Sequence, residues 1–195
     1  MNQDVGAGRA SPVRGVSPVQ NRLARRTIAI GLGALVVALA AQFAVPVPFS
    51  PVPMTLQPLA VLVVGGLLGP GAGVAALVLY IVLGAIGFPV YAGGGSGALH
   101  LVGPTGGYLL AFPVAAGVTG ALTARGFSAL RVLVACALGM LVIHIGGVAQ
   151  LALLGGDPGL ALRVGFLPFF TGDLLKIGLA ALIILVVGPK LRPLL

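Results

Sequence analysis

Acidic residues are almost absent from this chain. Only Asp4, Asp157 and Asp173 carry carboxylates among 195 residues, and charged residues of both signs make up 7% of the sequence. A soluble domain carries about 25% charged residues. Together with 58% hydrophobic residues and a mean hydropathy of +1.16, this scarcity excludes an ordinary soluble domain and predicts a polytopic protein of the lipid bilayer.

Cysteine and the common catalytic motifs are also scarce. The lone Cys136 lies in an apolar segment, so it forms neither a disulfide framework nor a zinc site. The sequence contains no paired carboxylates, HExxH motif, Ser/His/Asp cluster or GxxxxGK[ST] nucleotide loop. We therefore expect no enzyme activity, no metal and no cofactor. Positive residues flank the apolar segments, which argues against nucleic acid as the reason for the net charge of +8.

Long apolar segments predict an all-α fold. A spanning helix needs about 20 apolar residues, so roughly six spans fit. Without water, only helices or closed barrels satisfy the backbone, and the alternation typical of barrel strands is absent. Polar residues 1–21 predict a disordered tail, and residues 22–195 a single six-helix transmembrane domain. The expected helices are 27–45, 58–68, 74–88, 108–124, 133–154 and 168–187.

Three uncharged connections interrupt these helices. Segment 58–68 is too short to span upright by itself, and the sequence GPGAG at 69–73 predicts a tight turn after it. A proline-rich linker, PVPFSPVPMTLQ, precedes that segment. A glycine-rich loop, PVYAGGGSGALHLVGPTGG, follows residue 88. Its glycines permit close approach of the backbone to a ligand or a helix.

The distribution of Lys and Arg predicts the topology. Cytoplasmic loops carry an excess of these residues. With six spans and both termini cytoplasmic, the outer face holds only Arg163, and the linker and the glycine-rich loop also lie outside. The inner face then holds Arg22, Arg25, Arg26, Arg125, Arg131, Lys190 and Arg192. We expect a multi-pass protein of the plasma membrane.

Asp173 and Lys176 lie in an apolar stretch, PFFTGDLLKIGLAALIILVVG. An ionisable group in hydrocarbon costs roughly 2.5 kcal/mol or more and usually faces a cavity or a partner. Residues at i and i+3 share one helix face. This face offers an acceptor for N–H groups and a cation for an anion, which suits a small polar solute. The alternative is a structural ion pair between the two residues.

Four longer runs follow one another within about Ala34 to Ala181: PVPFSPVPMTLQPLAVLVVGGLLGPGAG, LYIVLGAIGFPVYAGGGSG, LVGPTGGYLLAF and TGDLLKIGLA. In this order they resemble the BioY family, the biotin-specific substrate-binding (S) components of energy-coupling factor (ECF) transporters. The resemblance implies a six-helix S-component fold and capture of biotin from outside. It also implies a transmembrane coupling protein and two ATPase subunits as partners.

The resemblance assigns ligand roles to particular residues. Asp173 would accept N–H bonds from the ureido ring of biotin, and Lys176 would pair with its carboxylate. Aromatic packing is assigned to Phe88, Tyr91 and Tyr108, hydrogen bonding to Thr55, Gln57 and Thr105, and close backbone approach to Gly93.

Several polar and aromatic residues have a structural alternative to ligand binding. Tyr91 and Tyr108 would suit an aromatic belt at the membrane interface. Thr55 and Gln57 would suit a helix cap, and His100 a solvated loop. For His144 and Gln150, in segment 133–154, interhelical hydrogen bonding is favoured over ligand contact.

Ala34 and Ala38 form a small-xxx-small pattern. This pattern indicates either a docking face for helices of the coupling protein or packing within the bundle.

Two other functions of the whole protein would also use residues such as Asp173 and Lys176. A proton-coupled permease also needs an intramembrane carboxylate, although it is usually longer and built of inverted repeats. An S component for another small carboxylate-bearing vitamin would have a similar site.

Overall fold

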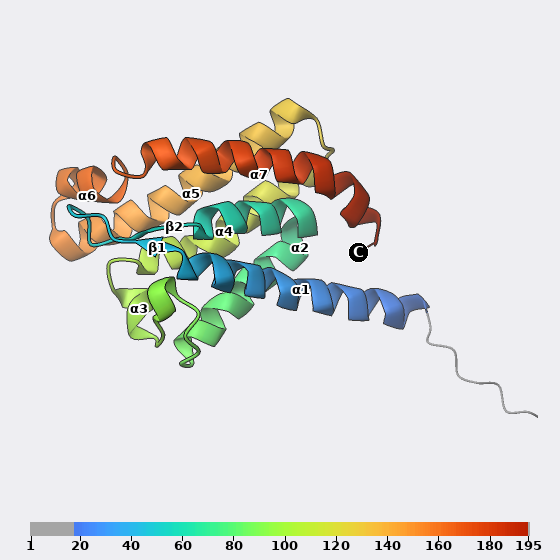
Figure 1. Cartoon of the computed structure of the whole chain (residues 1–195), viewed down its shortest axis with the longest axis horizontal. Coiled ribbons are helices and arrows are strands. Elements are labelled where there is room, and N and C mark those ends of the chain that lie inside the picture. The colour runs from blue at the N-terminus through green and yellow to red at the C-terminus, as the bar shows by residue number, and fades with distance from the viewer. Residues whose placement is uncertain (1–17, 195) are drawn as a thin grey trace, which may run out of the picture.

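The computed structural model describes residues 18–194, which are mostly helical (Figure 1). The described residues contain five helices that are long and apolar enough to cross a membrane, as expected of a multi-pass membrane protein. These are α1 (Pro18–Gln42), α2 (Gln57–Ala85), α4 (Gly106–Ala124), α5 (Ala129–Gly155) and α7 (Phe170–Leu191). The shorter elements are η1 (Ala92–Gly94), α3 (Leu99–Val102), α6 (Pro158–Gly165) and η2 (Arg192–Leu194).

Most helices lie where the apolar segments predicted them. Helix α1 begins at Pro18, within the range predicted as a tail, and the rest of that range lies outside the described residues. Two short strands that the sequence did not predict lie at the two ends of the proline-rich linker. The first occupies residues 44–45, the end of the range predicted as helix 27–45, so that part of the prediction is wrong. Helix α1 already ends at Gln42, because Pro46 disfavours helical backbone in the residue before it. Strand β1 (Ala44–Val45) pairs antiparallel with β2 (Met54–Thr55), so the two ends of the linker lie side by side.

Helix α2 reverses direction in its middle. Gly69 adopts φ +80°, which glycine tolerates, and Pro70 follows it. A Cβ on Gly73 would lie 3.0 Å from the Cα of Gly65, whereas a straight helix separates residues eight apart by about 12 Å. The Gln57 side chain also reaches the Tyr80 hydroxyl at 2.6 Å. The halves 57–68 and 70–85 therefore run antiparallel. A count of six spans is not confirmed, because α2 is a single element among the five long helices.

The reversal leaves one backbone carbonyl without its usual partner. In a continuous helix the Gly66 carbonyl would accept from residue 70, but Pro70 has no N–H. Arg192 Nη2 donates to this carbonyl at 2.7 Å, and Thr123 Oγ1 at 3.2 Å. Gly120 of α4 packs onto the break, since a Cβ there would lie 2.6 Å from the Gly69 carbonyl carbon. Helix α4 and η2, which directly follows α7, thus hold the turn of α2.

Helix α2 lies at the centre of the bundle and packs against α1, α4 and α7. On α1 the small residues face inward. Ala34 is only 3% exposed and belongs to the core, whereas Ala38 is half-buried at its edge. Large side chains such as Leu35 and Leu39 point outward instead. For Ala34 the structure favours packing within the bundle over an open docking face.

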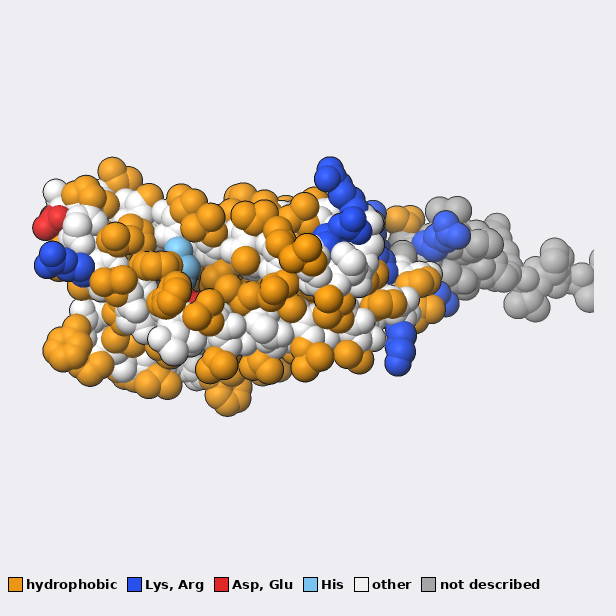
Figure 2. All heavy atoms as spheres, turned by 90° about the horizontal axis from the view of Figure 1, so that it is seen from above, with side chains coloured by type: hydrophobic (Ala, Val, Ile, Leu, Met, Phe, Trp, Pro, Cys, Tyr) orange, Lys and Arg blue, Asp and Glu red, His pale blue; other side chains and the backbone are white. Residues whose placement is uncertain are grey.

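Basic side chains gather toward one end of the molecule (Figure 2). At this end the Arg25 guanidinium lies 3.5 Å from the Leu194 carbonyl, and Arg131 donates to the Arg125 carbonyl at 2.7 Å. Helix α6, which contains Arg163 and is capped by Asp157, lies at the opposite end (Figure 1). The long helices therefore connect a basic end with an end formed by α6, the linker and the glycine-rich loop.

Candidate ligand-binding cavity

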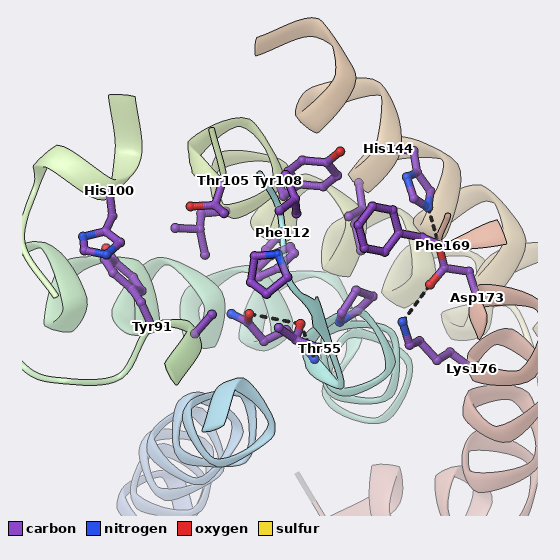
Figure 3. A pocket seen from close by; sticks show the side chains of 17 residues that line it. Thr55, Tyr91, His100, Thr105, Tyr108, Phe112, His144, Phe169, Asp173 and Lys176 are labelled. Atoms are coloured by element: carbon purple, nitrogen blue, oxygen red, sulfur yellow. Dashed lines mark hydrogen bonds and ion pairs between the residues drawn. The ribbon is translucent and has the colours of Figure 1, made fainter. Parts of the chain in front are cut away.

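A cavity of about 240 Å³ lies toward the end of the bundle that carries the loops (Figure 3). Four long helices, α2, α4, α5 and α7, contribute side chains to it, together with the linker and the glycine-rich loop. Its lining consists of Val52, Pro53, Thr55, Gln57, Pro58, Tyr91, Ala92, His100, Thr105, Tyr108, Leu109, Phe112, Ile143, His144, Phe169, Asp173 and Lys176.

The Asp173 carboxylate is the most closely partnered group in this lining. It lies in the first turn of α7, where the helix dipole favours negative charge, and is 5% exposed. Lys176 Nζ donates to its Oδ1 at 2.9 Å. His144 Nε2 lies 2.7 Å from its Oδ2 (Figure 3). The ion pair considered as an alternative is therefore present, and both of its members also border the cavity.

His144 brings α5 to this cluster. Its side chain is buried, and the edge-to-face ring of Phe166 lies 4.9 Å away between centroids. The interhelical hydrogen bond favoured from the sequence is confirmed by the contact with Asp173. Gln150 instead donates to the carbonyls of Leu101 and Gly103, at 3.0 and 2.6 Å, and fixes the turn before α4.

The two predicted tyrosines lie inside the protein. Tyr91 is 1% exposed and its hydroxyl donates to the Ile81 carbonyl at 2.7 Å. Tyr108 is 8% exposed and donates to the Gly165 carbonyl at 2.6 Å. The aromatic-belt interpretation is therefore wrong for both, because their rings face the cavity. Burial raises the pKa of the Tyr91 phenol, which keeps this group protonated as a donor.

Three smaller polar residues border the cavity as well. Thr55 Oγ1 accepts the Gln57 backbone N–H and donates to Gln57 Oε1, both at 3.2 Å. The side chains of Thr55 and Gln57 thus stabilise the turn at the start of α2 and also line the cavity. Thr105 precedes α4 without a side-chain capping bond. Its hydroxyl is therefore not committed to capping that helix.

Phe88 and Gly93 are not brought to the cavity. Phe88 lies beyond the end of α2 and is 53% exposed. Gly93 adopts φ +63° in η1, and its neighbour Ala92 lines the cavity in its place. His100, expected as a solvated loop residue, is half-buried with its ring 5.5 Å from that of Tyr91.

Sequence reasoning missed the apolar part of the lining, which includes Phe112, Ile143 and Phe169. These residues lie in or beside apolar helices, where one hydrophobic side chain carries no signal that separates a cavity wall from the core. Among residues 18–194, no group of three or more His, Cys, Asp or Glu side chains is arranged to hold a metal ion.

The family model described as "BioY family" matches residues 10–192. The "Probable biotin transporter BioY" of Pyrococcus horikoshii is 40% identical over 155 residues, which cover 79% of this chain and 92% of that protein. The "Biotin transporter BioY" of Thermotoga maritima is 42% identical over 139 residues, which cover 71% and 82%.

The fold is similar to a crystal structure of the S-component for biotin from an ECF-type ABC transporter. The TM-score is 0.82 at 24% identity, and the match covers 89% of this chain and 96% of that one. At this identity the match shows the fold alone. The match of the family model over most of the sequence confirms the resemblance read from the motifs: this chain belongs to the BioY family.

Proposed function

We propose that this protein is the high-affinity, substrate-binding transmembrane component of a biotin uptake system. The observation that carries the proposal is the buried pair of Asp173 and Lys176 on the wall of one cavity. It occurs in a chain whose relatives are named biotin transporters.

The chemistry of the cavity suits biotin. Biotin has a neutral ureido ring with two N–H donors, an apolar thioether ring and an anionic tail. A carboxylate offers about four acceptor positions, and the Asp173 carboxylate uses one on each oxygen. Lys176 has three donors, of which one reaches Asp173. The remaining positions would serve the ureido N–H groups and the tail, while Tyr91, Tyr108 and Phe112 pack on the bicyclic ring.

The proposed topology has six crossings, with the two antiparallel halves of α2 counted separately. Both termini would then be cytoplasmic, since the basic residues at the ends of α1 and α7 lie at one end of the bundle. The cavity lies toward the opposite end and would open to the exterior. Labelling of single cysteines by a membrane-impermeant reagent tests this. Phe49 and Leu194 should be accessible from opposite sides of the membrane when replaced.

The proposed partners are an ECF transmembrane coupling protein and two ATPase subunits, because uptake against a gradient needs free energy from elsewhere. Ala38, a half-buried small residue on α1, remains a candidate contact for the coupling protein. Ala38→Leu should reduce concentrative uptake while biotin binding survives. Ala34→Leu is the comparison, because its extra volume enters the core and should destabilise the isolated protein by about 1–3 kcal/mol. Full uptake by Ala38→Leu would remove this residue from the docking surface.

Equilibrium binding by the purified chain tests the main proposal. Calorimetry without ATP or an ion gradient should detect tight binding of biotin. Biotin methyl ester should bind more weakly, because the charge-assisted bond to Lys176 contributes about 1.5–3 kcal/mol. Binding only under a proton gradient would favour an ion-coupled permease. A panel of other carboxylate-bearing vitamins identifies the substrate if biotin does not bind, and equal affinity for acid and ester would contradict the role of Lys176.

A further inference from the structure

The partners of Asp173 come from two different helices. Lys176 reaches Oδ1 from the next turn of α7, and His144 reaches Oδ2 from α5. All three side chains border the cavity, and all three residues are at most 7% exposed. A buried carboxylate that loses its partner is strongly destabilised. The contact with His144 therefore decides whether the Asp173 carboxylate still has a partner when Lys176 moves away from it.

The hydrogen-bond roles of His144 follow from its surroundings. An ionised carboxylate only accepts, so Nε2 of His144 carries the hydrogen directed at Oδ2. Its Nδ1 atom is buried and has no hydrogen-bond partner within residues 18–194. The contact with Asp173 is therefore the one hydrogen bond of the His144 ring within the described residues. The other titratable groups around the ring are Lys176 and Asp173 on α7 and Tyr108 on α4, with His100 across the cavity.

Lys176 carries the one ammonium group in the lining of the cavity, and two carboxylates share it when biotin binds. The charged side chains in the lining are Asp173 and Lys176, and the ligand adds its own carboxylate. Asp173 and the ligand then compete for the Lys176 ammonium. A donor on Oδ2 stabilises the Asp173 carboxylate independently of that cation, so Asp173 keeps a hydrogen-bond partner when Lys176 turns to the ligand.

We infer that His144 is a positioning residue that holds Asp173 in place and thereby leaves Lys176 available to the carboxylate of the ligand. The inference rests on the proposed function, in which Lys176 recognises an anionic tail. Its signature is discrimination between the acid and the ester of the ligand. A residue that only packs α5 against α7 would change stability without changing this ratio.

Three variants separate the roles. His144→Phe keeps an aromatic ring but removes the donor, whereas His144→Gln retains an N–H group near the position of Nε2. Gln150→Met is the matched control on the same helix, since it loses hydrogen bonds to Leu101 and Gly103 rather than to Asp173. Calorimetry measures the affinity of each purified variant for biotin and for biotin methyl ester.

We expect His144→Phe to bind biotin about tenfold or more weakly, as loss of one hydrogen bond to a charged group predicts. Its preference for the acid over the ester should fall toward one. His144→Gln should restore both quantities, and Gln150→Met should keep the wild-type preference. The inference is wrong if His144→Phe retains the wild-type preference for the acid over the ester. It is also wrong if His144→Gln loses affinity and preference to the same extent as His144→Phe.

A second measurement remains if His144→Phe does not fold. Nitrogen NMR of the wild-type protein labelled at histidine should show a proton on Nε2 of His144, with a signal that shifts in Asp173→Asn. The Nδ1–H form would overturn the inference, because it cannot donate to Oδ2. Wild-type protein that does not bind biotin, or binds acid and ester equally, would instead contradict the proposed function or the role of Lys176.

Discussion

Ionisable side chains lie at both ends of α7, buried near its start and half-buried just beyond its end, but the two ends use them differently. In its first two turns, Asp173 and Lys176 pair with each other and with His144 on the wall of a cavity. Just beyond its last turn, Arg192 donates to the Gly66 carbonyl and to Thr123, and its guanidinium lies 5.0 Å from the centre of the Phe127 ring.

An ionisable residue in a membrane protein is a functional candidate by default, and this contrast refines that rule. Arg192 satisfies a carbonyl that Pro70 leaves without a donor, so its role follows from the backbone of α2. Asp173 satisfies no backbone defect, and its side-chain partners leave acceptor positions open beside the cavity. We therefore propose ligand binding for the first end and structural support for the second.

The largest effect is expected where α4 supports the turn of α2. A Cβ on Gly120 would lie 2.6 Å from the Gly69 carbonyl carbon and 2.7 Å from the Pro70 nitrogen. These are backbone atoms that cannot move aside. Gly120→Ala should therefore destabilise the protein by about 3 kcal/mol or more, measured as thermal unfolding in detergent. Gly178→Ala is the control, because nothing lies within 4 Å of a Cβ there, and equal stability of the two variants would contradict the structural role.

A smaller effect, and on binding rather than stability, is expected at the cavity end. Asp173→Asn keeps the shape but replaces an ionised acceptor with a neutral amide. Affinity for biotin should fall more than tenfold, or about 1.5–3 kcal/mol, while the protein still folds because Lys176 borders the cavity. Calorimetry and thermal unfolding are measured together. Unfolding with retained affinity would make the cluster a structural ion pair and remove the contrast between the two ends.

Much of this contrast was predictable from local patterns. The apolar segments predicted the five long helices, with the two halves of α2 as separate helices, and Gly-Pro in GPGAG predicted the reversal at Gly69. The spacing of Asp173 and Lys176 placed them on one helix face, where they are found. Such features depend on neighbours within a few residues, so a single sequence contains them.

The remaining features depend on contacts between distant segments. His144 lies 29 residues from Asp173, and the sequence shows only that a polar side chain interrupts an apolar helix. The burial of Ala34 was not predictable for the same reason, because the partner helix α2 decides which face of α1 is covered. Phe88 was expected at the ligand through its neighbours in the motif, but α2 ends at Ala85 and leaves its ring exposed.

Arg192 offers a milder test of the structural end. Arg192→Met keeps an apolar stem but removes the donor to the Gly66 carbonyl, which then depends on the Thr123 hydroxyl. The loss of stability should be about 1–2 kcal/mol, with biotin affinity unchanged. Arg25→Met is a control, because its guanidinium is exposed and makes one long contact. A tenfold loss of affinity at unchanged stability would show that this end communicates with the ligand.

The smallest effect is expected at Asp157, which lies at the same end of the protein as the cavity but does not border it. This residue tests whether a carboxylate at that end affects binding without lining the cavity. Its Oδ1 caps α6 by accepting the N–H groups of Gly159 and Leu160 at 2.8 and 3.0 Å. Asp157→Ala should cost about 1 kcal/mol of stability, and Asp157→Asn almost nothing, since asparagine caps a helix as well as aspartate does. Neither should change biotin affinity measured by calorimetry. A loss of affinity in both variants would show that the negative charge of Asp157 attracts or orients the ligand over a distance. Binding would then depend on two carboxylates, those of Asp157 and Asp173, rather than on Asp173 alone.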